Sequence, residues 1–127
     1  MTSSAAGFEF TNDRPAAAEG RLIVRIPAGL NRKRRVLNEY ARQLRFPAYF
    51  GWNWDAFEEC LRDLSWLDDA KEVVIVHRDV PFPGSREQQQ TYLAILRDLV
   101  TTTDLRGPKF RVIFPRSGEQ SVTLSLD

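Results

Sequence analysis

The sequence has very few of the residues that build disulfides, metal sites or catalytic dyads. It contains one cysteine, Cys60, and one histidine, His77, among 127 residues. A single cysteine cannot form an internal disulfide, so nothing indicates an oxidising compartment. A lone histidine without a nucleophile beside it is typical of a structural residue, and helical carboxylates without histidine are a poor metal signal. We therefore expect no enzyme activity, no catalytic residue, no metal and no cofactor.

Long apolar runs and an excess of one charge are also missing. No segment approaches the roughly 18 apolar residues that a membrane helix needs. Residues 1–20 lack the basic start and the apolar stretch of a signal peptide. The formal net charge is only +1, so no global field attracts the chain to nucleic acid. With 43% hydrophobic and 28% charged residues, the composition is typical of a globular protein. We expect a cytoplasmic location.

The spacing of apolar residues predicts strands that alternate with helices. Short apolar runs with β-branched residues predict strands at 21–27, 72–76 and 110–115. Apolar residues at spacings of three and four predict amphipathic helices at 33–44, 54–64 and 85–101. Strands separated by helices indicate an α/β fold with a three-stranded parallel sheet and packed helices. Residues 121–126 alternate as a C-terminal edge strand would. We expect a flexible arm at 1–20 and one domain at 21–127.

Two adjacent segments carry opposite charges despite the small net charge. Residues 31–45 contain six basic residues and one acid, whereas residues 49–69 contain six acids and one base. Two solvated helix faces would explain this pattern, and so would a surface that binds a charged partner.

The second predicted helix carries a stripe of charged residues on one face. Asp55, Glu59 and Arg62 follow the spacing i, i+4, i+7, which places them in line along the helix. Other acidic and aromatic residues border this stripe: Tyr49, Trp52, Trp54, Glu58 and Asp63. Acids beside exposed aromatics suit an interface for a basic partner. The alternative is a solvated acidic face with the aromatics buried in the core.

The segment 46–61, FPAYFGWNWDAFEECL, resembles the signature of the barstar family. The residues that match the family pattern are Pro47, Tyr49, Phe50, Gly51, Asn53, Asp55, Ala56, Cys60 and Leu61. The order of elements from 21 to 115 also fits the family's fold, a three-stranded parallel sheet with helices. The first 20 and the last 12 residues lie outside this resemblance.

The resemblance implies an intracellular inhibitor of a secreted bacterial ribonuclease. In the family, a helix enters the cationic cleft of the ribonuclease and its carboxylates take the place of substrate phosphates. Glu59 stands where the family's main contact aspartate lies and is one methylene longer, and Asp98 matches a glutamate on a later helix. The resulting set of partner-binding residues is Tyr49, Trp52, Asn53, Trp54, Asp55, Glu58, Glu59, Arg62 and Asp98.

Three departures from a well-known family member leave the partner open. Glu58 replaces a tryptophan, Arg62 and Asp63 replace a Thr-Gly pair, and Thr102 stands where a second late acid lies. The partner is then a ribonuclease of different shape, or another basic protein such as a toxin to which this chain gives immunity. A small nucleic-acid binder that uses the basic residues 32–35 is less favoured, because no aromatic stacking partners lie in register.

Overall fold

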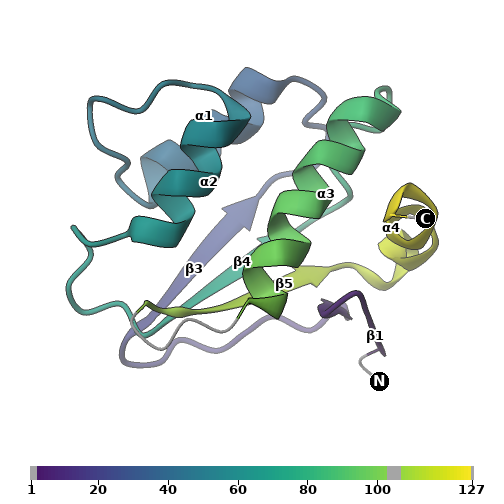
Figure 1. Cartoon of the computed structure of the whole chain (residues 1–127). Helices are drawn as coiled ribbons and strands as arrows, with labels where there is room; N and C mark the ends of the chain where they lie inside the picture. Colours follow the sequence, from purple (N-terminus) through teal and green to yellow (C-terminus); the bar gives the residue numbers. More distant parts are fainter. Residues whose placement is uncertain (1–2, 103–106, 127) are drawn as a thin grey trace.

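The computed structural model describes the backbone of residues 3–102 and 107–126, and the side chains from residue 6 onward within those ranges. The fold is α/β, with helices packed on a five-stranded sheet of order β1-β2-β5-β4-β3 (Figure 1). The strands are β1 (Ser3–Ala5), β2 (Phe8–Phe10), β3 (Arg21–Ile26), β4 (Glu72–His77) and β5 (Lys109–Phe114). The helices are α1 (Lys33–Gln43), α2 (Trp54–Asp63), α3 (Arg86–Thr101), the short 3-10 helix η1 (Arg116–Gly118) and α4 (Glu119–Leu126).

The three predicted strands form the parallel centre of this sheet. Val24 of β3 pairs with Ile75 of β4, which pairs with Val112 of β5. All three side chains are buried, because alternate residues of each strand point to the face that the helices cover. The predicted parallel sheet with packed helices is thereby confirmed, although the sheet has more strands than expected.

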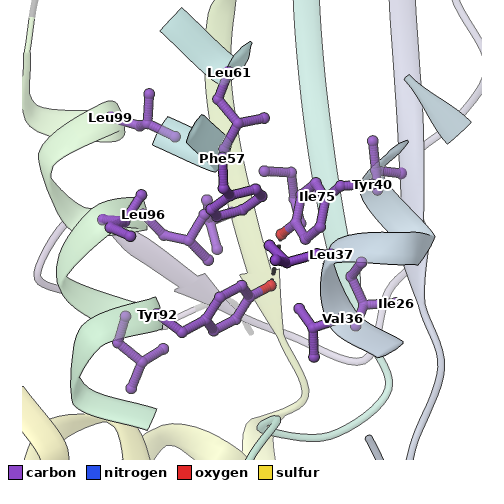
Figure 2. Packing of buried hydrophobic residues seen from close by; sticks show 14 of the residues in the cluster. Ile26, Val36, Leu37, Tyr40, Phe57, Leu61, Ile75, Tyr92, Leu96 and Leu99 are labelled. Atoms are coloured by element: carbon purple, nitrogen blue, oxygen red, sulfur yellow. Dashed lines mark hydrogen bonds between the residues drawn. The ribbon is translucent and has the colours of Figure 1, made fainter. Parts of the chain in front are cut away.

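The main core lies between the sheet and the helices α1, α2 and α3. Figure 2 shows side chains from all three helices converging on Ile75 of the sheet. At the centre, the hydroxyl oxygens of Tyr40 on α1 and Tyr92 on α3 lie 2.6 Å apart. Phe57 of α2 contacts both rings. Burying the tyrosines is tolerated because each hydroxyl finds a hydrogen-bond partner.

Part of the segment expected to be a flexible arm belongs to the sheet. Strand β2 pairs in parallel with β5, with Phe10 beside Phe114, and both Phe8 and Phe10 are completely buried. Strand β1 joins β2 through a two-residue turn in which Ala6 and Gly7 have positive φ, as tight hairpins require. The expectation for residues 8–10 was wrong because a three-residue strand carries too little periodicity to be recognised.

Residues 11–20, the crossover segment, lead from β2 to β3 across the sheet face opposite the helices (Figure 1). Arg21 Nη1 donates to the backbone oxygen of Ala16 at 2.6 Å. On the same face, Arg111 forms ion pairs with Glu9 and Glu72, and Glu72 also pairs with Arg21. The Arg111 hydrogen bond lowers the pKa of Glu9. This row of charges joins four neighbouring strands.

The predicted C-terminal edge strand is wrong, because residues 119–126 form the helix α4. Val122 and Ser125 are buried beside α3, and the Ser125 hydroxyl bonds Gln89 of that helix. Their spacing of three residues fits one face of a helix. The alternation seen in the sequence instead leaves Leu124 58% exposed. Packing on α3 therefore prevailed over local β-propensity.

Candidate protein-binding site

The loop before α2 is held by aromatic packing and ends in a helix cap. Phe50 is 5% exposed and contacts the rings of Phe46 and Trp52. Asn53 Oδ1 accepts a hydrogen bond of 2.7 Å from the backbone nitrogen of Ala56, which caps the first turn. Asn53 is thus placed to start α2 and to fix the direction in which its acidic face points.

Asp55 and Glu59 are exposed on α2, one helical turn apart. Neither side chain forms a hydrogen bond or an ion pair with any other residue that the structure describes. Asp55 lies in the first turn, where the helix dipole favours a negative charge, but Glu59 lies beyond that turn. The face therefore carries two carboxylates that are free to meet cations.

Glu58 and Arg62 are engaged with each other. Arg62 Nη2 lies 3.1 Å from Glu58 Oε2, in an i, i+4 ion pair that is partly exposed. Such pairs contribute only a few tenths of a kcal/mol, so either residue can exchange its partner at low cost. The pair places one cation inside an otherwise acidic face.

An open hollow of about 490 Å³ lies between the loop and α2. Tyr49, 77% exposed, stands in its lining together with Glu59 and Arg62. The other lining residues are Phe50, Gly51, Ala56, Cys60 and Asp63. Asp63 was not among the predicted site residues, although its i+4 spacing from Glu59 places both residues on the same face of the helix. The hollow combines an apolar part with charges of both signs.

Cys60 lines this hollow but is 6% exposed. Burial raises the pKa of its thiol, and the nearby carboxylates of Asp63 and Glu59 raise it further. The thiol is protonated at neutral pH and is a poor nucleophile. The interpretation of Cys60 as a packing residue agrees with this environment.

Two of the three predicted rim aromatics are packed rather than exposed. The guanidinium carbon of Arg34 lies 4.1 Å from the ring centre of Trp52, a cation–π contact. Trp54 donates from Nε1 to Gln88 Oε1 at 2.9 Å and contacts the ring of Phe82. Trp54 therefore joins α2 to α3, and the sequence could not distinguish this role from an exposed one.

Asp98 is exposed on α3 and does not line the hollow. Asn53, Asp55 and Glu58 also lie outside its lining, although all three belong to the α2 segment beside it. Thr102, which stands where a second acid was expected, is the C-cap residue of α3. Of the nine predicted residues, the structure brings Tyr49, Glu59 and Arg62 together in the hollow.

His77 lies in the core and does not line the hollow beside α2. Its Nδ1 lies 3.0 Å from the carbonyl oxygen of Ile113, and its Nε2 lies 2.7 Å from the hydroxyl of Tyr92. The ring stacks on Phe114 with centroids 4.1 Å apart. Burial lowers the pKa of His77 to about 3, which makes it a poor general base. The structural interpretation of His77 is confirmed.

Within residues 3–102 and 107–126, no group of three or more His, Cys, Asp or Glu side chains could hold a metal ion. Over the same described part of the chain, no helix has both the length and the apolar character needed to cross a membrane.

Comparison with protein families identifies the chain. The model of the Barstar family, described as barnase inhibitor, matches residues 24–115. This range includes the end of β3, then α1, the loop and α2, β4, α3 and β5. Searches of curated proteins and of solved structures found no match. Since the family model covers well over half of the chain, including the helix that carries the acidic face, this protein belongs to the barstar family.

Proposed function

We propose that this protein binds the active site of a bacterial ribonuclease through α2 and the preceding loop, and blocks it by occupying it. The observation that carries the proposal is that the exposed carboxylates of Asp55 and Glu59 have no partner among the described residues. Glu59 also lines the hollow beside Tyr49. Membership in a family described as barnase inhibitor supports the same partner class.

The physical basis is competition for cations. A ribonuclease must hold phosphates with basic side chains, and a well-placed carboxylate makes the same charge-assisted hydrogen bonds. Because Asp55 and Glu59 have no partner within the described part of the chain, binding breaks no internal ion pair at either residue. Their rigid placement on a capped helix lowers the entropy that association costs.

Tyr49 and the hollow supply the remaining contact. An exposed aromatic ring offers a large contact area at low cost in conformational entropy. The hollow beside it can receive a side chain from the partner, with Glu59 placed to neutralise a cation there. The chain performs no chemical step in this scheme. The same proposal includes a cytoplasmic location, because a newly made ribonuclease would threaten the cell's own RNA there.

An inhibition assay tests the proposal. Purified protein is mixed with each of several cationic secreted bacterial ribonucleases, and RNA cleavage is followed at increasing substrate concentration. Blocking by occupancy raises KM and leaves kcat unchanged. Asp55→Asn/Glu59→Gln should weaken inhibition strongly. The control Asp68→Asn/Asp69→Asn removes the same charge from exposed acids outside α2 and should inhibit as the wild type does.

Three results would contradict the proposal. Equal weakening by the two double variants would show that total charge and not the α2 face matters. Full binding of a ribonuclease without inhibition would show that the protein does not occupy the active site of that enzyme. Absence of binding to every ribonuclease, together with salt-sensitive binding to RNA, would favour the basic residues 32–35 as a nucleic-acid surface.

A further inference from the structure

A second hollow, of about 320 Å³, lies at the carboxyl ends of the strands on the side of the crossover segment. We call it the arginine hollow, after the three arginines in its lining. Its lining residues are Thr11, Asn12, Asp13, Arg14, Arg25, Val76, His77, Arg78 and Pro115. None of these residues lies on α2 or in the loop before it, so the arginine hollow is separate from the candidate protein-binding site.

The sheet and the crossover segment bring the three arginines together. Arg25 is paired with Val76 in the register of β3 and β4, and Arg78 lies two residues after Val76, directly after the end of β4. Residues two apart along a strand point to the same face, so Arg25, Val76 and Arg78 share one face of the sheet. Arg14 approaches this face from the crossover segment. Three arginines that are distant in the sequence thus contribute to one concave surface.

None of the three guanidinium groups has a partner within the described residues. Arg14, Arg25 and Arg78 form no side-chain hydrogen bond or ion pair there, whereas Arg21 and Arg111 of the same sheet both pair with Glu72. Asp13, Arg14's neighbour, is the acid in the lining, and it forms no ion pair with the described residues either. Three cations and one acid leave the hollow with an excess of positive charge.

Hydrogen bonds to the backbone hold the walls of the arginine hollow. The backbone nitrogen of Thr11 donates to the backbone oxygen of Phe114 at 3.0 Å, and Asn12 Oδ1 accepts from the backbone nitrogen of Arg116 at 3.1 Å. The amide of Gln43 bonds both the backbone nitrogen and the backbone oxygen of Arg25, each at 2.8 Å. The backbone nitrogen of Arg78 likewise donates to the backbone oxygen of Ile26 at 3.1 Å. The backbone at Arg25 and Arg78 is therefore preorganised, and a ligand has to order mainly the side chains.

We propose that the arginine hollow binds the phosphate group of a small phosphorylated molecule. A guanidinium group offers several donors in a planar fork that matches phosphate oxygens, and a concave wall strengthens the local field. In open α/β sheets, ligands bind outside the carboxyl ends of the strands, where this hollow lies. A volume of about 320 Å³ is at the lower end of the range for small-molecule sites.

A titration followed by NMR tests this proposal on the full-length chain. Isotope-labelled protein at low ionic strength receives inorganic phosphate, adenosine 5′-monophosphate or acetate, each at matched ionic strength. We expect saturable shifts of the amides of residues 11–14 and 76–78 with both phosphate probes, and at least about tenfold weaker binding of acetate. Tighter binding of the nucleotide than of phosphate would place its sugar and base in the hollow as well. Equal effects of acetate and phosphate would overturn the proposal.

Charge-matched variants separate this site from general attraction. Arg25→Gln/Arg78→Gln should weaken phosphate binding at least about tenfold, whereas Arg32→Gln/Arg35→Gln, which removes the same charge from exposed residues near the start of α1, should change it less than about twofold. Arg14→Gln, outside any helix or strand, provides a second test should the first variant not fold. Similar losses in both double variants, or unchanged binding in Arg14→Gln and Arg25→Gln/Arg78→Gln, would refute the site. Ribonuclease inhibition should be unaffected in all three.

Discussion

The Nε2 atom of His77 lies 2.7 Å from the hydroxyl oxygen of Tyr92, deep in the core. Because Nδ1 of the same ring faces the carbonyl oxygen of Ile113, that nitrogen carries the proton and Nε2 accepts from Tyr92. Tyr92 in turn accepts from the Tyr40 hydroxyl at 2.6 Å. The donors therefore all point the same way, from Tyr40 on α1 to Tyr92 on α3, then to His77 on β4 and on to β5. This arrangement requires a neutral imidazole.

We expect the protein to lose stability in mild acid because of His77. Burial lowers its folded pKa to about 3, whereas the unfolded chain has the ordinary value near 6.5. The unfolded state therefore binds the proton first. This contribution to stability is complete above about pH 6.5 and is lost as the pH falls toward the folded pKa. Below about pH 6 the free energy of unfolding should fall by roughly 1.4 kcal/mol per pH unit.

Urea unfolding at several pH values measures this loss, and NMR of the imidazole provides an independent check. The folded protein should keep a neutral His77 ring down to about pH 4. An imidazole that titrates near pH 6.5 in the folded protein would contradict both the burial and the hydrogen bonds described for it.

The two buried tyrosines should differ in their importance although they touch each other. Tyr92→Phe leaves the Nε2 atom of His77 without its donor, and an unsatisfied buried acceptor costs about 1–3 kcal/mol. Tyr40→Phe is the matched control, because Tyr92 can still donate to His77. Chemical denaturation should show the larger loss for Tyr92→Phe. Equal losses would mean that the direction of the hydrogen bonds is not as inferred.

Phe10 should matter for stability far more than an arm residue would. It is completely buried and stacks on Phe114, so Phe10→Ala should cost about 3–5 kcal/mol of unfolding free energy. The control Glu19→Ala changes an exposed residue of the crossover segment and should cost less than about 0.5 kcal/mol. A loss below about 1 kcal/mol for Phe10→Ala would restore the flexible arm that the sequence suggested.

Glu59 should contribute most to the binding of a ribonuclease. Truncation of a charge that is buried and paired in a complex costs about 2–5 kcal/mol, because its partner is left without a counter-charge, so Glu59→Ala should act mainly on the off-rate. The on-rate of the wild type should fall steeply as salt rises, while its off-rate changes little. Stopped-flow kinetics measures both rates. A Glu59→Ala variant that alters the on-rate alone would show that α2 steers the partner without contacting it.

Cys60 should react slowly with thiol reagents in the folded protein. The thiol is 6% exposed, and burial together with Asp63 and Glu59 raises its pKa. Labelling at pH 7 should therefore be much slower than in the urea-unfolded chain, in which the ordinary pKa returns. If the candidate partner occupies the hollow, its addition should slow the reaction further. Labelling at the same rate with and without a bound partner would place that partner elsewhere.

The candidate site could be partly predicted because its signals are local. The spacing of Asp55 and Glu59 places them on one side of any helix, and Asn53 is a cap by its own side-chain chemistry. The positions of Trp52 and Trp54 could not be predicted in this way. Trp52 contacts Arg34 and Trp54 contacts Gln88, and both partners are distant in the sequence. An aromatic ring fits equally well at the edge of an interface or in a core, so the residue type does not decide between them.

The sequence by itself determined the strands and helices of residues 21–115 and the acidic stripe of α2, because hydrophobic periodicity and capping act between residues a few positions apart. Only the tertiary structure decided that Phe8 and Phe10 extend the sheet, that residues 119–126 form a helix on α3, and that Arg14, Arg25 and Arg78 share one hollow. The physical reason is the same in each case. Short segments have little intrinsic preference, so their structure and neighbours are set by the surface that they bury against the rest of the fold.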